Sequence, residues 1–169
     1  MFREMRRTLQ VLPQEECEKL LQSGTAGVLA LTGDDGYPYA VPLSYAYAEG
    51  KLYFHCARTG HKIDAIRRSE KASFCVIGQD QIVPEELTTY YRSVIAFGRI
   101  RIVEEEKEKR RILGALADKY APTLSEEKRQ ASIEQDLAPV CILEMQVEHL
   151  SGKEGKKLAA ERQRGRSQA

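Results

Sequence analysis

The chain of 169 residues contains no tryptophan, few cysteines and no excess of charge of either sign. Its 26 lysines and arginines almost balance its 25 aspartates and glutamates, which leaves a formal net charge of +1. That balance gives no reason to expect nucleic acid or an anionic membrane as a partner. No apolar run approaches the length of a membrane span, and Met1–Thr8 is charged where a signal peptide would be apolar. We therefore expect a cytoplasmic protein.

The four cysteines are scattered, and no two of them are spaced as Cys-x-x-Cys. This spacing gives no indication of a zinc knuckle or a thioredoxin-type site, and we expect reduced thiols. His55, Cys56 and His61 are close enough in sequence to be considered as metal ligands. No carboxylate lies near them and their spacing matches no standard site, so we predict no metal.

Hydrophobic residues make up 42% of the chain and charged residues 30%, a balance typical of a globular domain. A chain of this length can bury a sizeable core without disulfides or metal. We predict one domain over residues 1–158. The basic tail over residues 159–169 is poor in apolar residues, and we expect it to be flexible.

Six segments show the alternation or the β-branched and aromatic content of strands, and tight turns join several of them. They are residues 26–32, 37–48, 51–57, 71–78, 89–103 and 138–150. Amphipathic segments predict helices over 12–24, 61–69, 104–120 and 125–137, and Pro84 marks a loop over 80–87. Gly98 predicts a bulge or a close backbone approach. Because the helices do not alternate one-for-one with the strands, we expect an antiparallel barrel or sandwich.

One face of the 37–48 segment carries only small side chains, from Pro38, Ala40, Pro42, Ser44 and Ala46. Such a face lets a flat ring lie against the backbone, whose N–H and C=O groups can contact the polar edge of the ring. Proline cannot donate to a strand ladder, so this strand is at an edge or is bulged. The alternative is that the small face packs under a helix.

A cationic turn follows the next predicted strand, with the residues Arg58, Thr59, Gly60, His61 and Lys62. It leads into the 61–69 helix, whose first N–H groups and dipole favour a phosphate. Two cations and a hydroxyl would add charge-assisted bonds, and glycine lets the backbone approach closely. The alternative is an ordinary solvated turn before a basic surface helix.

Four further residues are candidates on weaker grounds. His55 shares a strand face with Tyr53 and Ala57 and lies near the 58–62 turn. It could act as an acid or a base, contact a ligand, or be structural. Arg92 and Ser93 begin the longest strand. Arg92 could balance an anion or pair with an acid, Ser93 could donate to a polar ring, or both could lie exposed. Lys153 follows the last strand and could reach a ligand, or belong to a C-terminal turn.

Five short segments follow one another along the chain: Gly36–Ser44, Tyr53–Ala57, Gly60–Asp64, Tyr91–Val94 and Ser151–Glu154. In this order and spacing they resemble the nitroimidazole-resistance (Nim) proteins. These belong to the pyridoxamine 5′-phosphate oxidase-like, FMN-binding split-barrel superfamily. The resemblance runs from Met1 to about Leu158.

The resemblance implies a mainly β protein with flanking helices, built on a six-stranded antiparallel split β-barrel. It also implies a homodimer with two FMN sites at the interface. Pro42, Leu43 and Ser44 would border the flavin ring. The strand residues His55, Cys56 and Ala57, with the turn Arg58–Lys62, would carry the phosphate and ribityl chain. Arg92, Ser93 and Lys153 would approach the flavin, some from the partner subunit, and His55 would lie near the substrate.

The resemblance implies an FMN-dependent oxidoreductase that reduces the nitro group of 5-nitroimidazole-type compounds. The chain lacks the Arg-x-x-x-Arg-Leu element of true pyridoxamine 5′-phosphate oxidases, which argues against vitamin B6 oxidation. It also lacks a Gly-x-Gly-x-x-Gly fingerprint for a second nucleotide. Two alternatives remain open: a non-catalytic flavin or haem-type carrier, and a general FMN reductase of quinone-like acceptors.

Overall fold

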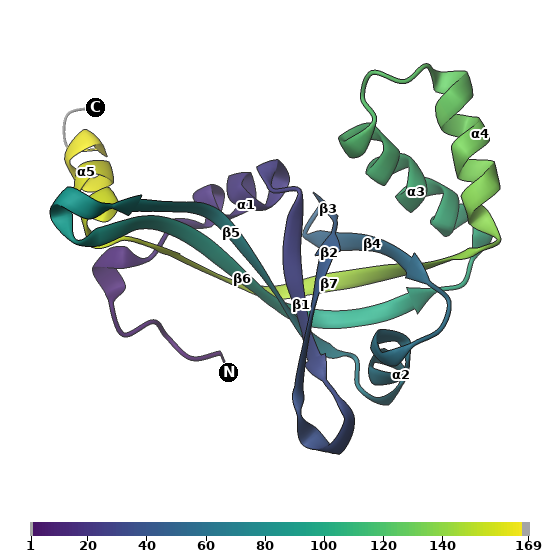
Figure 1. Ribbon diagram of the computed structural model, residues 1–169, viewed down its shortest axis with the longest axis horizontal. Helices are drawn as coiled ribbons and strands as arrows, with labels where there is room; N and C mark the ends of the chain where they lie inside the picture. The colour runs from purple at the N-terminus through teal and green to yellow at the C-terminus, as the bar shows by residue number, and fades with distance from the viewer. Residues whose placement is uncertain (1, 167–169) are drawn as a thin grey trace.

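The computed structural model describes residues 2–166, and its strands and helices follow one another as shown in Figure 1. The strands are β1 Ala26–Thr32, β2 Pro38–Ser44, β3 Ala46–Ala48, β4 Lys51–Ala57, β5 Lys71–Val83, β6 Thr88–Val103 and β7 Val140–Glu154. The helices are α1 Gln14–Ser23, α2 His61–Arg68, α3 Glu106–Tyr120, α4 Glu126–Leu137 and α5 Lys156–Arg166. Short 3₁₀ turns lie at Thr8–Gln10, Asp34–Gly36 and Pro84–Glu86.

All the strands belong to one antiparallel sheet in the order β2-β1-β5-β6-β7-β4-β3. The strands β2 and β3 therefore form opposite edges of the sheet, yet a single residue, Tyr45, joins them. The sheet must curl to bring its edges together. No ladder joins β2 to β3 or β4 in the described residues, so the curled sheet stays open as a split barrel.

The prediction of six strands is wrong, because the 37–48 segment divides at Tyr45 into β2 and β3. The ring of Tyr45 is fully buried, and its hydroxyl donates to the carbonyl oxygen of Leu21 at 2.7 Å. Both backbone groups of Tyr45 bond to the hydroxyl of Tyr120 at 2.8 Å. The backbone of Tyr45 is thus bonded to a helix side chain, which interrupts the strand.

Two groups of buried side chains hold the fold together. In the larger, Phe74 of β5 packs edge-on against Tyr45 and Phe54, with ring centroids 4.9 and 5.1 Å apart. The helices α1 and α2 cover this group with Leu21 and Ile63. Such aromatic pairs add about 0.5–1.5 kcal/mol beyond their buried area. The smaller group lies between the α3–α4 helix pair and residues of β3, β4, β6 and β7.

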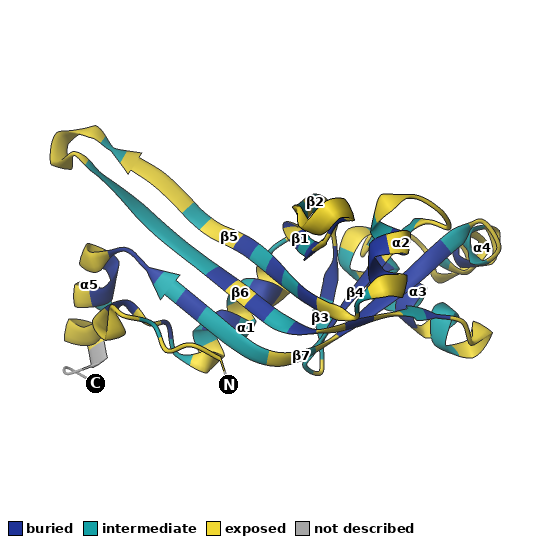
Figure 2. Cartoon of the chain, turned by 90° about the horizontal axis from the view of Figure 1, so that it is seen from below, coloured by how far each residue is buried: buried dark blue, intermediate teal, exposed yellow. Residues whose placement is uncertain are grey.

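The predicted loop over residues 80–87 is wrong, because β5 continues to Val83 and pairs with β6 to the end. Only the 3₁₀ turn at Pro84–Glu86 reverses the chain. Proline sits at the start of that turn, where its missing N–H costs no ladder bond. The resulting ribbon extends beyond the rest of the sheet, with exposed side chains toward its tip (Figure 2).

Gly98 produces both features that the sequence predicts. The register of β6 against β7 shifts between Phe97 and Gly98, which marks a bulge. A Cβ at Gly98 would lie 2.0 Å from the carbonyl oxygen of Gln146, so only glycine allows the two backbones to approach this closely.

The last strand runs further than predicted, to Glu154, and α5 follows it. The Glu154 carboxylate is fully buried and pairs with Arg92 of β6 at 3.3 Å and with Arg162 of α5 at 2.6 Å. Leu158 and Ala159 are also buried. We expected this tail to be flexible, but as far as Arg166 it forms a helix that packs against the rest of the chain. Residues 167–169 lie outside the described residues. Within residues 2–166 no helix is long and apolar enough to span a membrane.

Candidate functional site

The small-residue face of β2 is open. Pro38, Ala40, Pro42 and Ser44 are all exposed, whereas the other face, with Leu43, packs against the core. The strand β2 is at an edge of the sheet, as Pro42 predicted. No helix covers these four residues, so the alternative of a face packed under a helix does not hold for them. Ala46, beyond the Tyr45 break, is the exception and is buried.

The turn after β4 has a backbone that requires glycine. Gly60 has φ 118° and ψ 174°, a region that residues with a Cβ avoid, and it precedes the first residue of α2. Its carbonyl oxygen accepts the N–H groups of Ile63 and Asp64. The N–H groups of His61 and Lys62 have no helical partner, because they belong to the first turn of α2. The turn therefore presents open N–H donors at the positive end of a helix.

The three cations of this turn differ in what they contact. Arg58 donates to the carbonyl oxygen of Ala138, beyond α4, at 3.0 Å. The ring of His61 stacks on Tyr39 with centroids 4.0 Å apart, and its Nε2 lies 3.5 Å from Asp34. Lys62 is half-buried and forms no hydrogen bond or ion pair with any residue that the structure describes. Lys62 is therefore the cation of the turn that is best placed to meet an anion.

His55 is exposed on β4 and pairs across the sheet with Ile142 of β7. Cys56 faces Cys141 on β7, and burial raises the pKa of its thiol to about 11, although the charge of Lys62 lowers it in part. Such a thiol stays protonated at neutral pH and is a poor nucleophile. Ala57 ends the strand, exposed, just before the cationic turn.

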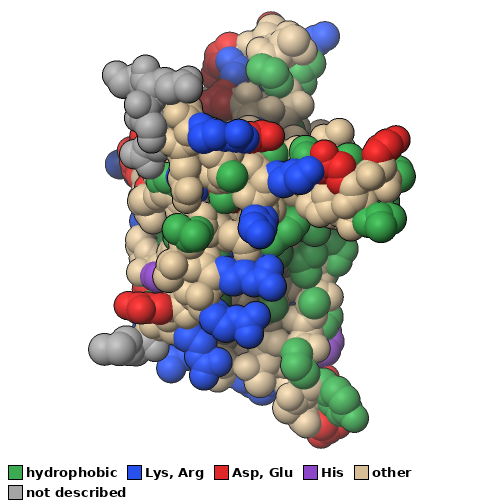
Figure 3. Space-filling view, turned by 90° about the vertical axis from the view of Figure 1, so that its left-hand side faces the viewer, with side chains coloured by type: hydrophobic (Ala, Val, Ile, Leu, Met, Phe, Trp, Pro, Cys, Tyr) green, Lys and Arg blue, Asp and Glu red, His purple; other side chains and the backbone are tan. Residues whose placement is uncertain are grey.

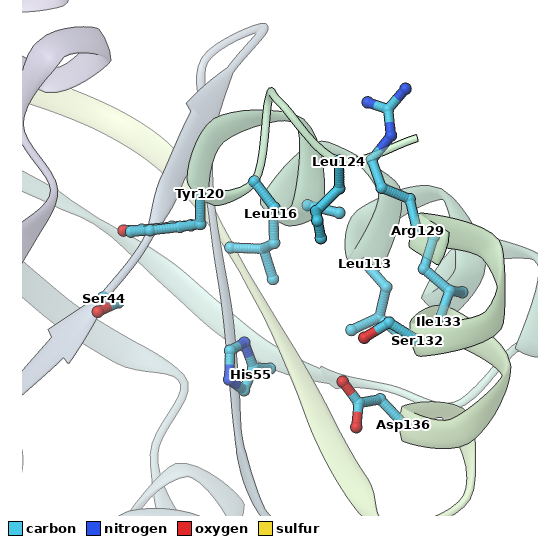
Figure 4. A pocket seen from close by; sticks show the side chains of 12 residues that line it. Ser44, His55, Leu113, Leu116, Tyr120, Leu124, Arg129, Ser132, Ile133 and Asp136 are labelled. Atoms are coloured by element: carbon cyan, nitrogen blue, oxygen red, sulfur yellow. The ribbon is translucent and has the colours of Figure 1, made fainter. Parts of the chain in front are cut away.

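His55 and Ser44 line the same pocket, so the end of β2 and the outer part of β4 meet there (Figure 4). The opposite wall comes from α3 and α4, a contribution that the sequence did not predict. The polar residues Ser132 and Asp136 of α4 belong to this wall. The pattern of α3 indicated its apolar face, but nothing local indicated where the helix pair would pack.

The structure does not bring Arg92, Ser93 and Lys153 to the cationic turn of the same chain. His55 pairs with Ile142, which pairs with Val103 at the far end of β6. Ser93 lies ten residues earlier on β6, roughly 33 Å along the strand at about 3.3 Å per residue. Figure 1 shows the two ends of β6 on opposite sides of the molecule.

At that end Ser93 pairs with Lys153, whose ammonium lies 5.7 Å from the centre of the Tyr91 ring. Arg92 pairs with Glu154, so the sequence-based option of an acid partner for this arginine is correct. Figure 3 views the molecule from this side, and lysine and arginine side chains form a column across it. The described residues contain no group of three or more His, Cys, Asp or Glu side chains that could hold a metal.

The glycine turn contacts the strand β2 through the stacked rings of His61 and Tyr39. The family model described as pyridoxamine 5′-phosphate oxidase matches residues 13–154. The chain therefore belongs to the pyridoxamine 5′-phosphate oxidase family.

The chain is also similar to individual proteins. The uncharacterized protein RA0666 of Rhizobium meliloti (strain 1021) is 33% identical over 91 residues, 54% of this chain, and the match spans about half (55%) of that relative. A candidate 5-nitroimidazole antibiotic resistance protein of Bacteroides thetaiotaomicron VPI-5482 has a similar structure, with TM-score 0.72, 22% identity and coverage of 85% of this chain and 86% of that one. A FAD-binding protein of Mesorhizobium loti has TM-score 0.62 at 26% identity, with coverage of 87% and 98%.

Proposed function

We propose that this protein is an FMN-dependent oxidoreductase that reduces the nitro group of 5-nitroimidazole-type compounds. The observation that carries the proposal is an exposed small-residue strand, β2, that contacts the glycine turn through the stacked rings of Tyr39 and His61. The N–H groups of this turn and its unpaired Lys62 suit a phosphate. A ligand that needs both a flat surface and an anion site is a planar ring system with a phosphate. Flavin mononucleotide fits this description, and two of the similar proteins described above carry names that concern flavin binding or nitroimidazole resistance.

The residues present fit the phosphate end of FMN. Gly60 has no neighbouring atom within 4 Å of the place where a Cβ would be, so the space beside the turn is open. Thr59 is exposed, and Lys62 has no partner among residues 2–166. Each charge-assisted bond that they form with a phosphate would contribute about 1.5–3 kcal/mol. Arg58 and His61 already contact Ala138 and Asp34, so they are less available to the phosphate than Lys62 is.

The residues also fit the ring end. Pro42 and Ser44 expose backbone and small side chains, and their strand has a free edge whose N–H and C=O groups can contact a polar ring. Bound FMN supplies the electron transfer that a nitro group requires. The chain itself positions the acceptor: His55 lies at the pocket beside Ser44, where its imidazole can orient a nitro group or donate a proton.

We further propose that two copies of the chain complete each site. Arg92, Ser93 and Lys153 lie at the opposite end of β6 from the cationic turn, so within one chain they cannot share its ligand. A row of paired residues runs from Pro42 across the neighbouring strands β1, β5 and β6. It consists of Val28, Cys75 and Ile95, which are apolar and partly exposed. A second copy packed on this face would bury it. It would also bring the lysine and arginine side chains of one chain toward the turn of the other.

Two other functions use the same site. A flavin or haem-type carrier needs the small-residue face of β2 and the 58–62 turn, but it needs no catalytic role for His55. A general FMN reductase of quinone-like acceptors needs His55 and the pocket but no selectivity for nitro groups. Fold and family do not distinguish these functions, whereas turnover does.

The variant His55→Gln tests the proposal, because glutamine can still form hydrogen bonds but does not titrate. With FMN bound and a nicotinamide reductant under anaerobic conditions, we expect this variant to reduce a 5-nitroimidazole about a hundredfold more slowly than the unchanged protein. His55→Ala should lose at least as much. Disappearance of the nitro absorbance gives the rate, and flavin absorbance confirms equal loading. A full rate in His55→Ala would show that the histidine has no part in the reaction, and an inactive unchanged protein would favour the carrier.

A further inference from the structure

The pocket that contains His55 lies between the sheet and the α3–α4 helix pair and has a volume of about 240 Å³. This is smaller than the roughly 300–1,000 Å³ typical of pockets for drug-sized ligands, so the pocket suits a molecule of one or two rings. It begins at Ser44, at the end of the small-residue face of β2, and extends away from that face toward the helices. The upper part of the pocket in Figure 4, which we call the ceiling, differs in chemistry from the lower part, where His55 and Asp136 lie.

The ceiling is apolar. Leu113, Leu116 and Ile133 are buried and form its inner part. Tyr120 and Leu124, at 42% and 43% exposure, are large apolar side chains that stay open to solvent where they line the pocket. An exposed apolar lining of this kind favours a planar ligand that can pack between the helices and the sheet.

Three polar side chains of the pocket have no protein partner among the described residues. His55, Ser132 and Asp136 form no hydrogen bond or ion pair with any residue in the described range 2–166. Figure 4 shows the carboxylate of Asp136 and the ring of His55 directed into the same space. Three polar groups that converge on one apolar pocket are the arrangement expected of a site that fixes the orientation of a ligand.

Asp136 gives the pocket a negative character. It lies in the last turn of α4, where the helix dipole already favours positive charge. Arg129 also lines the pocket, but its guanidinium bonds to Asp118 and Glu126 and points away from the cavity. Arg58 approaches the end of α4, where it donates to the carbonyl oxygen of Ala138. Neither arginine is therefore bonded to the Asp136 carboxylate.

We propose that the α3–α4 pocket binds the electron acceptor, and that Asp136 makes it select small planar compounds that carry a positively charged or N–H-donating group. This inference rests on the proposed function, since it names the acceptor class of the same site. A neutral compound of equal shape binds through the apolar ceiling alone. A cationic compound gains the attraction of Asp136 as well. An anionic compound is repelled by this carboxylate and binds least.

Calorimetric titration of the oxidised protein, without reductant, tests this selection with two probes of one shape, 4-nitrobenzylamine and 4-nitrobenzyl alcohol. We expect the unchanged protein to bind the amine about tenfold more tightly, because its ammonium can form a charge-assisted hydrogen bond with the partly buried carboxylate of Asp136. In Asp136→Asn the preference should fall below about twofold, with the alcohol unaffected. Glu127→Gln, which removes a carboxylate from the other end of α4, should keep the full preference. Equal binding of both probes by the unchanged protein, or a preference that survives in Asp136→Asn, would overturn the proposal.

A second variant separates this pocket from the flavin site. Ala117 lines the pocket from α3, and Ala117→Leu fills part of it. Both probes should then bind at least tenfold more weakly, while FMN binding stays within twofold. Loss of FMN binding instead would assign the pocket to the flavin and contradict the proposal. Because no turnover is involved, an Asp136-dependent preference without nitro reduction would refute the proposed function alone, whereas reduction without any charge preference would refute this inference alone.

Discussion

Replacing Lys62 with alanine is expected to weaken FMN binding by about ten- to a hundredfold. Lys62 is the cation of the 58–62 turn that has no partner among the described residues, so its charge is available for a phosphate. The loss of one charge-assisted bond costs about 1.5–3 kcal/mol, and each 1.4 kcal/mol is a factor of about ten in affinity. Quenching of flavin fluorescence during titration gives the dissociation constants.

Two comparisons make this result specific. Riboflavin lacks the phosphate, so Lys62→Ala should change its affinity by less than about twofold. Arg67→Ala removes a positive charge from the same helix at a position that faces solvent and pairs with Asp64, and it should leave FMN affinity nearly unchanged. Equal losses for FMN and riboflavin, or equal losses in the two variants, would mean that Lys62 does not contact the phosphate.

Substituting alanine for Gly98 is expected to destabilise the protein by about 3 kcal/mol or more. The added Cβ would lie 2.0 Å from the carbonyl oxygen of Gln146 and 2.9 Å from its carbonyl carbon. Both are backbone atoms of the neighbouring strand, so relief requires β6 and β7 to separate at the bulge. Overpacking of flexible side chains alone costs about 1–3 kcal/mol, and a backbone clash costs more. Urea unfolding followed by circular dichroism measures the change.

Gly114 provides the matched control, with an effect of opposite sign. It lies within α3, and a Cβ there would meet no atom within 4 Å. Gly114→Ala should therefore stabilise the protein by about 0.5–1 kcal/mol, because alanine loses less entropy in a helix. A Gly98→Ala protein as stable as the original would show that the bulge does not need its glycine.

Much of the secondary structure could be predicted because its determinants are local. The apolar run of β1 lies between Gly24 and Gly33 and has the same limits in the structure as in the prediction. The helix α2 begins where Gly60 permits a backbone that other residues avoid, and its buried Ile63 and Ile66 follow helical spacing. These signals are independent of the rest of the chain.

The parts that could not be predicted depend on distant contacts. The break at Tyr45 is made by the hydroxyl of Tyr120, a residue 75 positions away. The ribbon end of β5 is mostly exposed and joins neither buried core group, and its ladder with β6 makes it a strand. The C-terminal helix looks too polar to dock, but it is fixed by the Arg162 bond to the buried Glu154.

The candidate site shows the same division. The small face of β2 and the turn before α2 could be predicted from adjacent residues, and both are open in the structure. Which cation is available could not be predicted, since Arg58 and His61 are engaged by Ala138 and Asp34 from distant segments. The α4 wall with Asp136 was also missed, because helix spacing indicates an apolar face and not the strand that it covers.

Native mass spectrometry of the protein after incubation with FMN tests the central claim most directly, since it reports the number of chains and of flavins together. The account predicts a particle of roughly twice 19.1 kDa that carries two FMN molecules. Single chains without flavin, at FMN concentrations that saturate other flavoproteins of this size, would contradict the site on β2 and the 58–62 turn.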